Sequence, residues 1–217
     1  MGNDMTIETA GPPARSTYRH GDLRRALLEA GMALARDGGP DAVVLREATR
    51  RAGVAPNAAY RHFASRQALL QAVRAAALAR LALAIESELA ALGRRRRPAD
   101  LARASLRAVG TAYLRFAFEE TGLFRTAFAP GPMPADGDPA AVGGSGLNPF
   151  QLLGVALDRM AAAGLLPPAR RPGAEYLAWS AVHGMALLAL DGPLSRLARA
   201  EADALGQRLL DMVETGL

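Results

Sequence analysis

Four hydrogen-bonding side chains lie close together at positions 57, 60, 61 and 62, shortly after a Gly that interrupts a helical pattern. Asn57, Tyr60, Arg61 and His62 can each bond a base edge or a backbone phosphate of a nucleic acid. All 26 basic residues of the chain are Arg, and the planar, permanently charged guanidinium suits phosphate. This local combination of residue types favours nucleic-acid binding.

Other kinds of chemistry find little support. The chain has no Cys, which excludes disulfides, thiolate metal sites and Cys nucleophiles and suits a cytoplasmic protein. Its three His residues do not have metal-ligand spacing. The run Gly143-Gly144-Ser145-Gly146 is no nucleophile elbow because no apolar strand precedes it, and a phosphate-binding loop needs the Lys that is missing here. We therefore expect no enzymatic activity, no metal and no cofactor.

Helical periodicity runs through the chain, and no alternating pattern is long enough for a strand. Leu23, Leu27, Ala30 and Leu34 mark one face of a first helix, which Gly38-Gly39-Pro40 ends. Further helices are predicted at about 45–52, 56–63, 66–92, 99–118, 121–128, 148–165, 173–190 and 195–215. Residues 129–149 contain ten Gly or Pro in 21 positions, which predicts a mobile loop. The fold class is all-α.

Positions 44–63 have the layout of a helix-turn-helix. Small residues, Ala48, Ala52 and Ala59, stand where two short helices would approach each other, and Gly53 would take the positive φ angle of the turn. In such a motif the second helix enters the major groove of DNA. Small residues and a Gly also occur between helices of ordinary bundles, so the pattern alone leaves that alternative open.

Positive charge is densest in the first folded segment. Residues 15–66 contain ten Arg and five acidic residues, a net charge of +5, whereas residues 67–217 contain 16 Arg and 14 acidic residues, a net charge of +2. Residues 1–17 have the composition of a flexible polar arm without the apolar core of a signal peptide. No run of about 18 uncharged apolar residues occurs, so we expect no transmembrane helix.

The stretch from Leu45 to Leu70 resembles the N-terminal domain of TetR-type bacterial transcriptional regulators. The resemblance rests on Ala52-Gly53-Val54, Tyr60-Arg61-His62-Phe63 and Ser65-Arg66 with Leu69-Leu70. Further on, Trp179 with His183-Gly184 is similar to the Trp-x-x-x-His-Gly pattern of one C-terminal domain class in these regulators. The resemblance implies an arm at 1–17, a three-helix DNA-binding domain at 18–66, and a helical bundle at 67–217 that binds a ligand and dimerises.

The resemblance also implies roles for individual positions. Base reading would fall to Pro56, Asn57 and Ala58, of which only Asn57 can form two hydrogen bonds with one base. Pro56-Asn57 and Ala58 depart from the common pattern of the family, and Arg66 stands where a Lys is usual, so the base preference stays open. The candidates for contacts with backbone phosphates are His20, Arg46, Thr49, Tyr60, His62 and Arg66.

In the C-terminal part, aromatic and Met side chains predict a pocket for a hydrophobic or amphipathic ligand, although each of them could equally be plain core. They are Tyr113, Phe116, Phe124, Phe128, Phe150, Met160 and Trp179. His183 shares a helix face with Trp179, which favours a structural hydrogen bond over a ligand contact. The resemblance places a dimer interface on the last two long helices, whose apolar positions could instead be core: Leu177, Met185, Leu188, Leu205, Leu209 and Met212.

The predicted function is that of a cytoplasmic, ligand-responsive regulator, a repressor that binds a palindromic operator as a homodimer. A small apolar effector would release it from the double-stranded DNA. The alternative is a helical small-molecule-binding protein, or an enzyme acting on an apolar metabolite, in which the basic N-terminal segment is incidental. A membrane-surface protein is less well supported, because the single Trp lies in an apolar helix rather than opposite an Arg-rich face.

Overall fold

The computed structural model describes residues 20–93, 97–135 and 137–217, with side chains from Leu23 onward, and the arm expected at 1–17 lies outside this range. Within these residues the chain is helical and forms no strand, as predicted. Two short 3₁₀ helices, Pro168–Arg170 and Pro193–Arg196, join the last long helices. The α-helices are α1 (His20–Ala42), α2 (Leu45–Ala52), α3 (Pro56–Ala59), α4 (Arg66–Ala91), α5 (Pro98–Glu119), α6 (Thr121–Ala127), α7 (Pro149–Ala162), α8 (Ala174–Leu190) and α9 (Arg199–Gly216).

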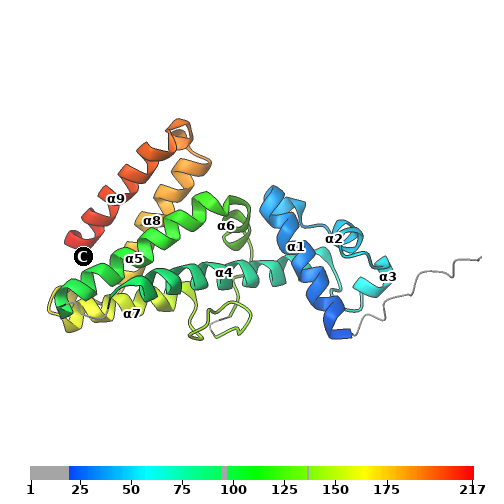
Figure 1. The fold of residues 1–217 in the computed structure, drawn as a ribbon, viewed down its shortest axis with the longest axis horizontal. Helices are drawn as coiled ribbons and strands as arrows, with labels where there is room; N and C mark the ends of the chain where they lie inside the picture. Colours follow the sequence, from blue (N-terminus) through cyan, green and yellow to red (C-terminus); the bar gives the residue numbers. More distant parts are fainter. Residues whose placement is uncertain (1–19, 94–96, 136) are drawn as a thin grey trace, which may run out of the picture.

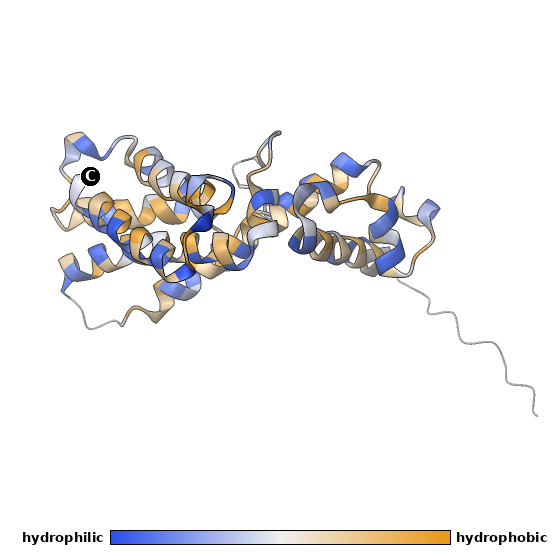
Figure 2. Ribbon diagram, turned by 90° about the horizontal axis from the view of Figure 1, so that it is seen from above, coloured by the Kyte–Doolittle hydropathy of each residue, from blue (hydrophilic) through white to orange (hydrophobic). Residues whose placement is uncertain are grey.

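The molecule is elongated, with α1, α2 and α3 at one end and α5 to α9 at the other (Figure 1). Helix α4 extends from the small end into the larger body and belongs to both. Its residues Leu69 and Val73 are fully buried, as is Leu27 of α1, and further along Leu81 and Ile85 are fully buried in the same continuous core. Figure 2 shows hydrophobic segments, in orange, along the helices of the larger body.

Helix α4 is long and apolar enough to cross a bilayer by length and composition, although the sequence contains no fully uncharged run of that length. More than half of its most apolar window, 56%, is buried inside the molecule. The helix packs against α1, α5, α6 and α7. Its apolar character is therefore explained by its place at the centre of the core.

A second contact between the two ends is made by α6, which packs on α1. A side chain on Gly122, in the first turn of α6, would overlap the backbone carbonyls of Ala35 and Arg36. The two helices can approach this closely only because position 122 carries no Cβ. The small end formed by α1, α2 and α3 thus contacts the larger body through α4 and α6.

Most helix boundaries agree with the sequence pattern, but α7 ends at Ala162 and not at 165, and α9 begins at Arg199 and not at 195 because Pro193–Arg196 forms a 3₁₀ helix. Helices α1 and α3 also differ from the prediction. Helix α1 is bounded by His20 and Ala42, but the backbone of Gly38 and Gly39 is not helical. This interruption lies where the sequence predicts the end of the helix. Helix α3 is shorter than predicted: it ends at Ala59, and the N–H groups of His62 and Phe63 both bond the Ala59 carbonyl in a tight turn. The connection from 128 to 148 contains no helix or strand in its described residues.

Candidate nucleic-acid interface and ligand cavity

The turn between α2 and α3 has the backbone that the sequence predicts. Gly53 adopts φ 66° and ψ 30°, the left-handed region that costs a residue with a side chain strain. Its N–H bonds the Arg50 carbonyl, and the N–H of Val54 bonds the Thr49 carbonyl. Ala48 and Ala59 are fully buried where the two helices meet. The segment is therefore a helix-turn-helix by its geometry.

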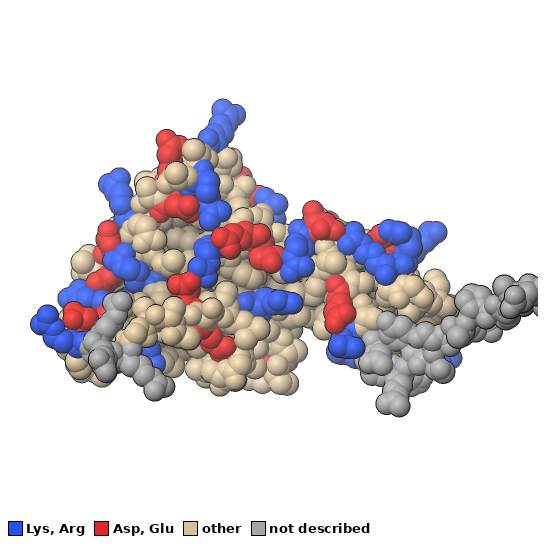
Figure 3. Space-filling view, viewed as in Figure 1, with Lys and Arg blue, Asp and Glu red and all other residues tan. Residues whose placement is uncertain are grey.

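Helix α3 presents a polar surface to solvent. Pro56 occupies the first turn, where its missing N–H has no helical partner to lose. Asn57 and Arg61 are exposed, and Tyr60 is 59% exposed, while Ala58 and His62 are half-buried. Figure 3 shows Arg side chains gathered over this end of the molecule.

Ion pairs already neutralise part of the positive charge of α2. Arg50 donates two hydrogen bonds to Glu47, at 2.9 and 2.6 Å, and these bonds lower the pKa of the Glu47 carboxyl. Arg51 pairs with Asp37 at 2.9 Å. Arg46 and Arg61 are exposed and form no ion pair among the residues that the structure describes. Their guanidinium groups remain available to meet an anion.

Thr49 and Arg66, two of the residues predicted to contact phosphates, bond backbone carbonyls of this chain. Thr49 is only 2% exposed, and its hydroxyl donates to the Arg46 carbonyl at 2.6 Å, so it faces the core instead of the DNA side. The Arg66 guanidinium donates to the carbonyls of Val43 and Pro40, both at 2.9 Å. Two nitrogens of the Arg66 guanidinium therefore stabilise the end of α1. The side chain of His20 lies outside the described range.

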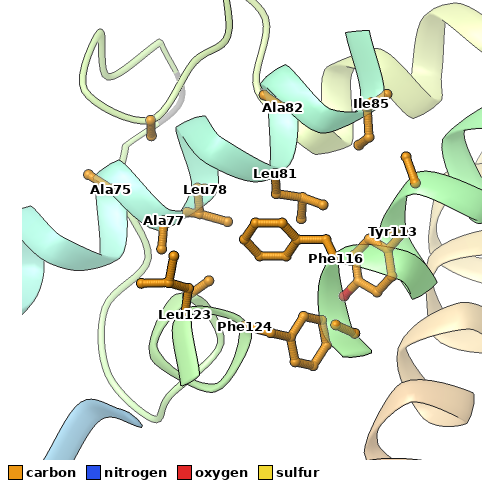
Figure 4. Packing of buried hydrophobic residues seen from close by; sticks show 14 of the residues in the cluster. Ala75, Ala77, Leu78, Leu81, Ala82, Ile85, Tyr113, Phe116, Leu123 and Phe124 are labelled. Carbon is orange, nitrogen blue, oxygen red and sulfur yellow. The ribbon is translucent and has the colours of Figure 1, made fainter. Parts of the chain in front are cut away.

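A cavity of about 310 Å³ lies inside the larger body, between α4, α5, α7, α8 and α9. Four of the predicted ligand-binding residues line it: Tyr113, Phe128, Phe150 and Trp179. Phe116, Phe124 and Met160 do not line this cavity and are buried in the packed core, the alternative left open for each of them. Figure 4 shows the Phe116 ring directed at Leu81 of α4.

Sequence reasoning missed two groups of cavity residues. The first comes from the Gly- and Pro-rich connection and includes Met133, Pro134, Ala135 and Ala141. The second is an ion pair at the cavity wall, in which Arg107 of α5 donates to Glu214 of α9 at 2.8 Å. The compositional bias of residues 129–149 was the one available signal for the first group. Nothing local in the sequence pairs positions 107 and 214.

Two of the cavity residues, Tyr113 and Trp179, form a chain of hydrogen bonds with His183 behind them. The Trp179 indole N–H donates to the Tyr113 hydroxyl at 3.1 Å, and that hydroxyl lies 2.7 Å from Nδ1 of His183. Burial raises the pKa of Tyr113 and lowers that of His183, so the phenol keeps its proton and the ring is neutral. The hydroxyl therefore donates to Nδ1. This confirms the structural hydrogen bond predicted for His183.

Apolar side chains are exposed on the outer face of α8 and α9. Leu177 is 66% exposed, and Leu188 and Met212 are also exposed. Met185 is buried in its own subunit, which is the core alternative left open for these positions, while Leu205 and Leu209 are half-buried. A face of this kind is a candidate contact surface.

Comparisons with known proteins agree with this geometry at both ends of the chain. Residues 27–73, from α1 into α4, match the family described as bacterial regulatory proteins, tetR family. Residues 106–213, from α5 into α9, match the tetracyclin repressor-like C-terminal domain. The chain belongs to the TetR family. It is a transcriptional regulator with a helix-turn-helix DNA-binding domain. A search of curated protein sequences found no match.

Several solved structures share the fold of this chain. A protein of unknown function from Rhodococcus sp. RHA1 is 28% identical, with a TM-score of 0.72, 94% of this chain covered and 99% of that one. The regulator FadR from Bacillus subtilis, solved with stearoyl-CoA, is 11% identical with a TM-score of 0.61, covering 89% and 98%. A TetR variant from Acinetobacter baumannii AYE, solved with minocycline, is 20% identical with a TM-score of 0.56, covering 88% and 93%.

Proposed function

We propose that this TetR-family regulator is a cytoplasmic repressor that binds a palindromic operator as a homodimer and leaves it when a small ligand occupies the cavity. The observation that carries the proposal is the joint presence of a helix-turn-helix at one end and a mostly apolar cavity at the other. Helix α4 contributes Leu78 and Ile85 to the cavity wall and Leu69 to the packing against α1. One rigid element thus belongs to both sites.

On the DNA, exposed Asn57 would read a base, with Pro56 and Ala58 beside it able to meet only an apolar group such as a thymine methyl. Tyr60, His62 and the free Arg46 would contact phosphates on either side of the groove. Thr49 is left out of this set because its hydroxyl is buried. A phosphate at the start of α4 would accept hydrogen bonds from the free backbone N–H groups there. The Arg66 guanidinium lies nearby, bound to the carbonyls of Val43 and Pro40.

The ligand would be apolar or amphipathic. Aromatic rings and aliphatic side chains supply most of the cavity wall, and the hydroxyl of Tyr113, which accepts from Trp179, is one of its few polar groups. A ligand that fits only one conformer of α4 shifts the population toward that conformer. If that conformer sets the two recognition helices at the wrong spacing, the operator is released. The position of Trp179, His183 and Gly184 also supports assignment to the Trp-x-x-x-His-Gly class.

Dimerisation through α8 and α9 would place two helix-turn-helix motifs on a two-fold axis. Two such motifs reach successive major grooves about 34–36 Å apart, which requires a palindromic site. A single motif makes too few contacts for tight specific binding. The exposed leucines of α8 support this arrangement.

Asn57→Ala tests the DNA-binding part of the proposal. The DNA is the region upstream of the gene, compared with a random duplex in gel-shift titrations at several salt concentrations. The substitution should weaken operator binding by about 1–3 kcal/mol and leave binding to the random duplex nearly unchanged, because a base contact carries sequence information and a phosphate contact does not.

Tyr60→Phe is the matched control, since it removes only a hydroxyl placed for phosphate. It should weaken binding to both duplexes equally. An equal loss on both duplexes for Asn57→Ala would assign Asn57 to phosphate. If the unaltered protein binds neither duplex, the helical small-molecule-binding protein becomes the better description.

A further inference from the structure

The Gly-rich end of the α6–α7 connection is bound to α4 by a single carboxylate. We call residues 137–147 the flap. The backbone N–H groups of Gly144 and Ser145 each donate to the Glu86 carboxylate at 2.9 Å, and the Ser145 hydroxyl donates to it at 2.5 Å. Glu86 lies near the C-terminal part of α4, 58 positions before the flap residues that it holds.

These bonds are of a strong kind, because a charged acceptor takes three donors. Burial raises the pKa of the Glu86 carboxyl while the bonds from Ser145 and Gly144 lower it, and the net direction is down. The carboxylate is therefore ionised at neutral pH. The same side chain is half-buried, so water can take the place of the flap donors when the flap moves away.

A side chain at one position would displace the Glu86 carboxylate from the contact, whereas a side chain at the next position would fit. A Cβ on Gly143 would overlap the Glu86 carboxylate, whereas a Cβ on Gly144 would meet its nearest atom at 3.4 Å, an ordinary contact. Neither residue has a positive φ angle. The two positions therefore differ in their approach to Glu86 and not in backbone strain.

The flap is a wall of the cavity. Ala141, in its middle, lines the cavity and is only 4% exposed. Just before the flap, the connection is tied to α4 a second time. The fully buried Arg74 guanidinium donates to the carbonyls of Ala129, Pro130 and Pro132, at 2.6, 3.2 and 2.5 Å.

The two ties differ in what it costs to break them. Releasing the carbonyls from Arg74 would leave a buried charge with only the Gln71 amide oxygen, at 3.5 Å, as a partner, since Arg74 forms no ion pair with any described residue. Releasing the amides from Glu86 exposes a carboxylate that already faces water in part. The connection is therefore fixed at its Arg74 end and free to open at its Glu86 end.

We propose that Glu86 is the positioning residue for the outer wall of the cavity: it holds the flap closed, and ligand enters where the flap leaves Glu86. The inference rests on the proposed function, because it assumes that the cavity takes a ligand. Through Glu86 the flap is also attached to α4, so a ligand that changes the fit of the flap acts directly on the helix that reaches the DNA-binding end.

A reporter for flap opening is available because the chain contains no Cys. Ala141→Cys introduces one thiol, on the cavity side of the flap, with room for the sulfur in the cavity. Its rate of alkylation by iodoacetamide measures how often the flap opens. In this background, Gly143→Ala should raise the rate roughly tenfold or more, the factor that corresponds to losing one hydrogen bond to a charged group. Gly144→Ala should leave it unchanged.

A second pair of variants changes the other side of the contact. Glu86→Ala should raise the alkylation rate at least as much as Gly143→Ala, and adding Gly143→Ala to it should have no further effect. Glu88→Ala is the control, because Glu88 binds Arg115 of α5 and not the flap. Circular dichroism establishes that each variant is folded. Equal rates in Glu86→Ala and Glu88→Ala would overturn the proposal.

The neutral fluorophore phenylnaphthylamine separates this inference from the proposed function. If the flap controls entry, Glu86→Ala should speed both association and dissociation of the dye, and Glu88→Ala should not. Absence of any binding to the unaltered protein would count against the apolar ligand of the proposed function, whereas the alkylation rates would still decide whether Glu86 holds the flap. Dye kinetics unchanged by Glu86→Ala would contradict entry at the flap.

Discussion

At the scale of single residues, the cavity is organised around Tyr113. Its hydroxyl accepts from Trp179 and donates to His183, and its ring stands edge-on to Phe124 at 5.6 Å between centroids. Burial favours the neutral form of every polar group in this set. The Tyr113 hydroxyl can therefore donate to Nδ1 only while His183 is unprotonated.

This leads to a dependence of stability on pH. Burial lowers the pKa of His183 from 6.5, so between the lowered value and 6.5 the unfolded chain binds more protons than the folded one. The contribution of His183 to stability is therefore complete above about pH 6.5 and is lost as the pH falls through the lowered pKa. Urea unfolding at about pH 7.5 and about pH 5.5 should show a larger loss for the unaltered protein than for His183→Gln. Parallel losses in both proteins would contradict the assignment.

At the scale of elements, the helix-turn-helix depends on one backbone conformation. Nothing lies within 4 Å of a Cβ placed on Gly53, so the requirement for Gly comes from its φ angle and not from crowding. The turn sets how α3 leaves α2, and with it the direction in which Asn57 faces.

Gly53→Val should therefore abolish binding to the operator while the protein stays helical and folded. The strain of a side chain in the left-handed region is roughly 1–2 kcal/mol, and branching at Cβ increases it. Gly53→Asn is the matched control, because Asn tolerates this region best among residues with a side chain. Gel shifts and circular dichroism on the same preparations measure both properties. Full operator affinity in Gly53→Val would mean that the turn does not position a DNA-reading helix.

At the scale of the whole molecule, two surfaces far apart must act together. The DNA-binding end and the α8–α9 face lie at opposite ends of an elongated chain (Figure 1). The outward-facing apolar side chains of α8 are Tyr176, Leu177, Leu187 and Leu188. Covering them in a dimer would fix the separation of two DNA-binding ends.

The double substitution Leu177→Arg with Leu188→Arg should convert the dimer into a monomer, because it places four buried charges in a two-fold interface. Sedimentation velocity measures the change, and operator affinity should fall with it. Leu83→Arg is the control: Leu83 is 48% exposed on α4, away from that face. An unchanged dimer in the double variant would place the interface elsewhere.

The sequence by itself determined the features that depend on neighbours along the chain. Helix positions followed from apolar spacing, the turn at Gly53 from a local φ requirement, and the cap of α4 from Ser65, whose hydroxyl accepts from the N–H of Ala68. The family resemblance rested on the same short stretch. Each of these needs only a few consecutive residues, so one sequence contains the information.

Only the tertiary structure decided which side chains face the cavity, the core or the DNA side. Tyr113 and Phe116 are three positions apart on α5 and share its apolar side, yet one lines the cavity and the other packs against Leu81. Arg66 meets carbonyls 23 and 26 positions away, and Glu86 meets amides 58 and 59 positions away. Helical periodicity predicts which residues share a face of a helix but not which element packs against that face. The partners of a long side chain depend on which distant segment of backbone lies within its reach.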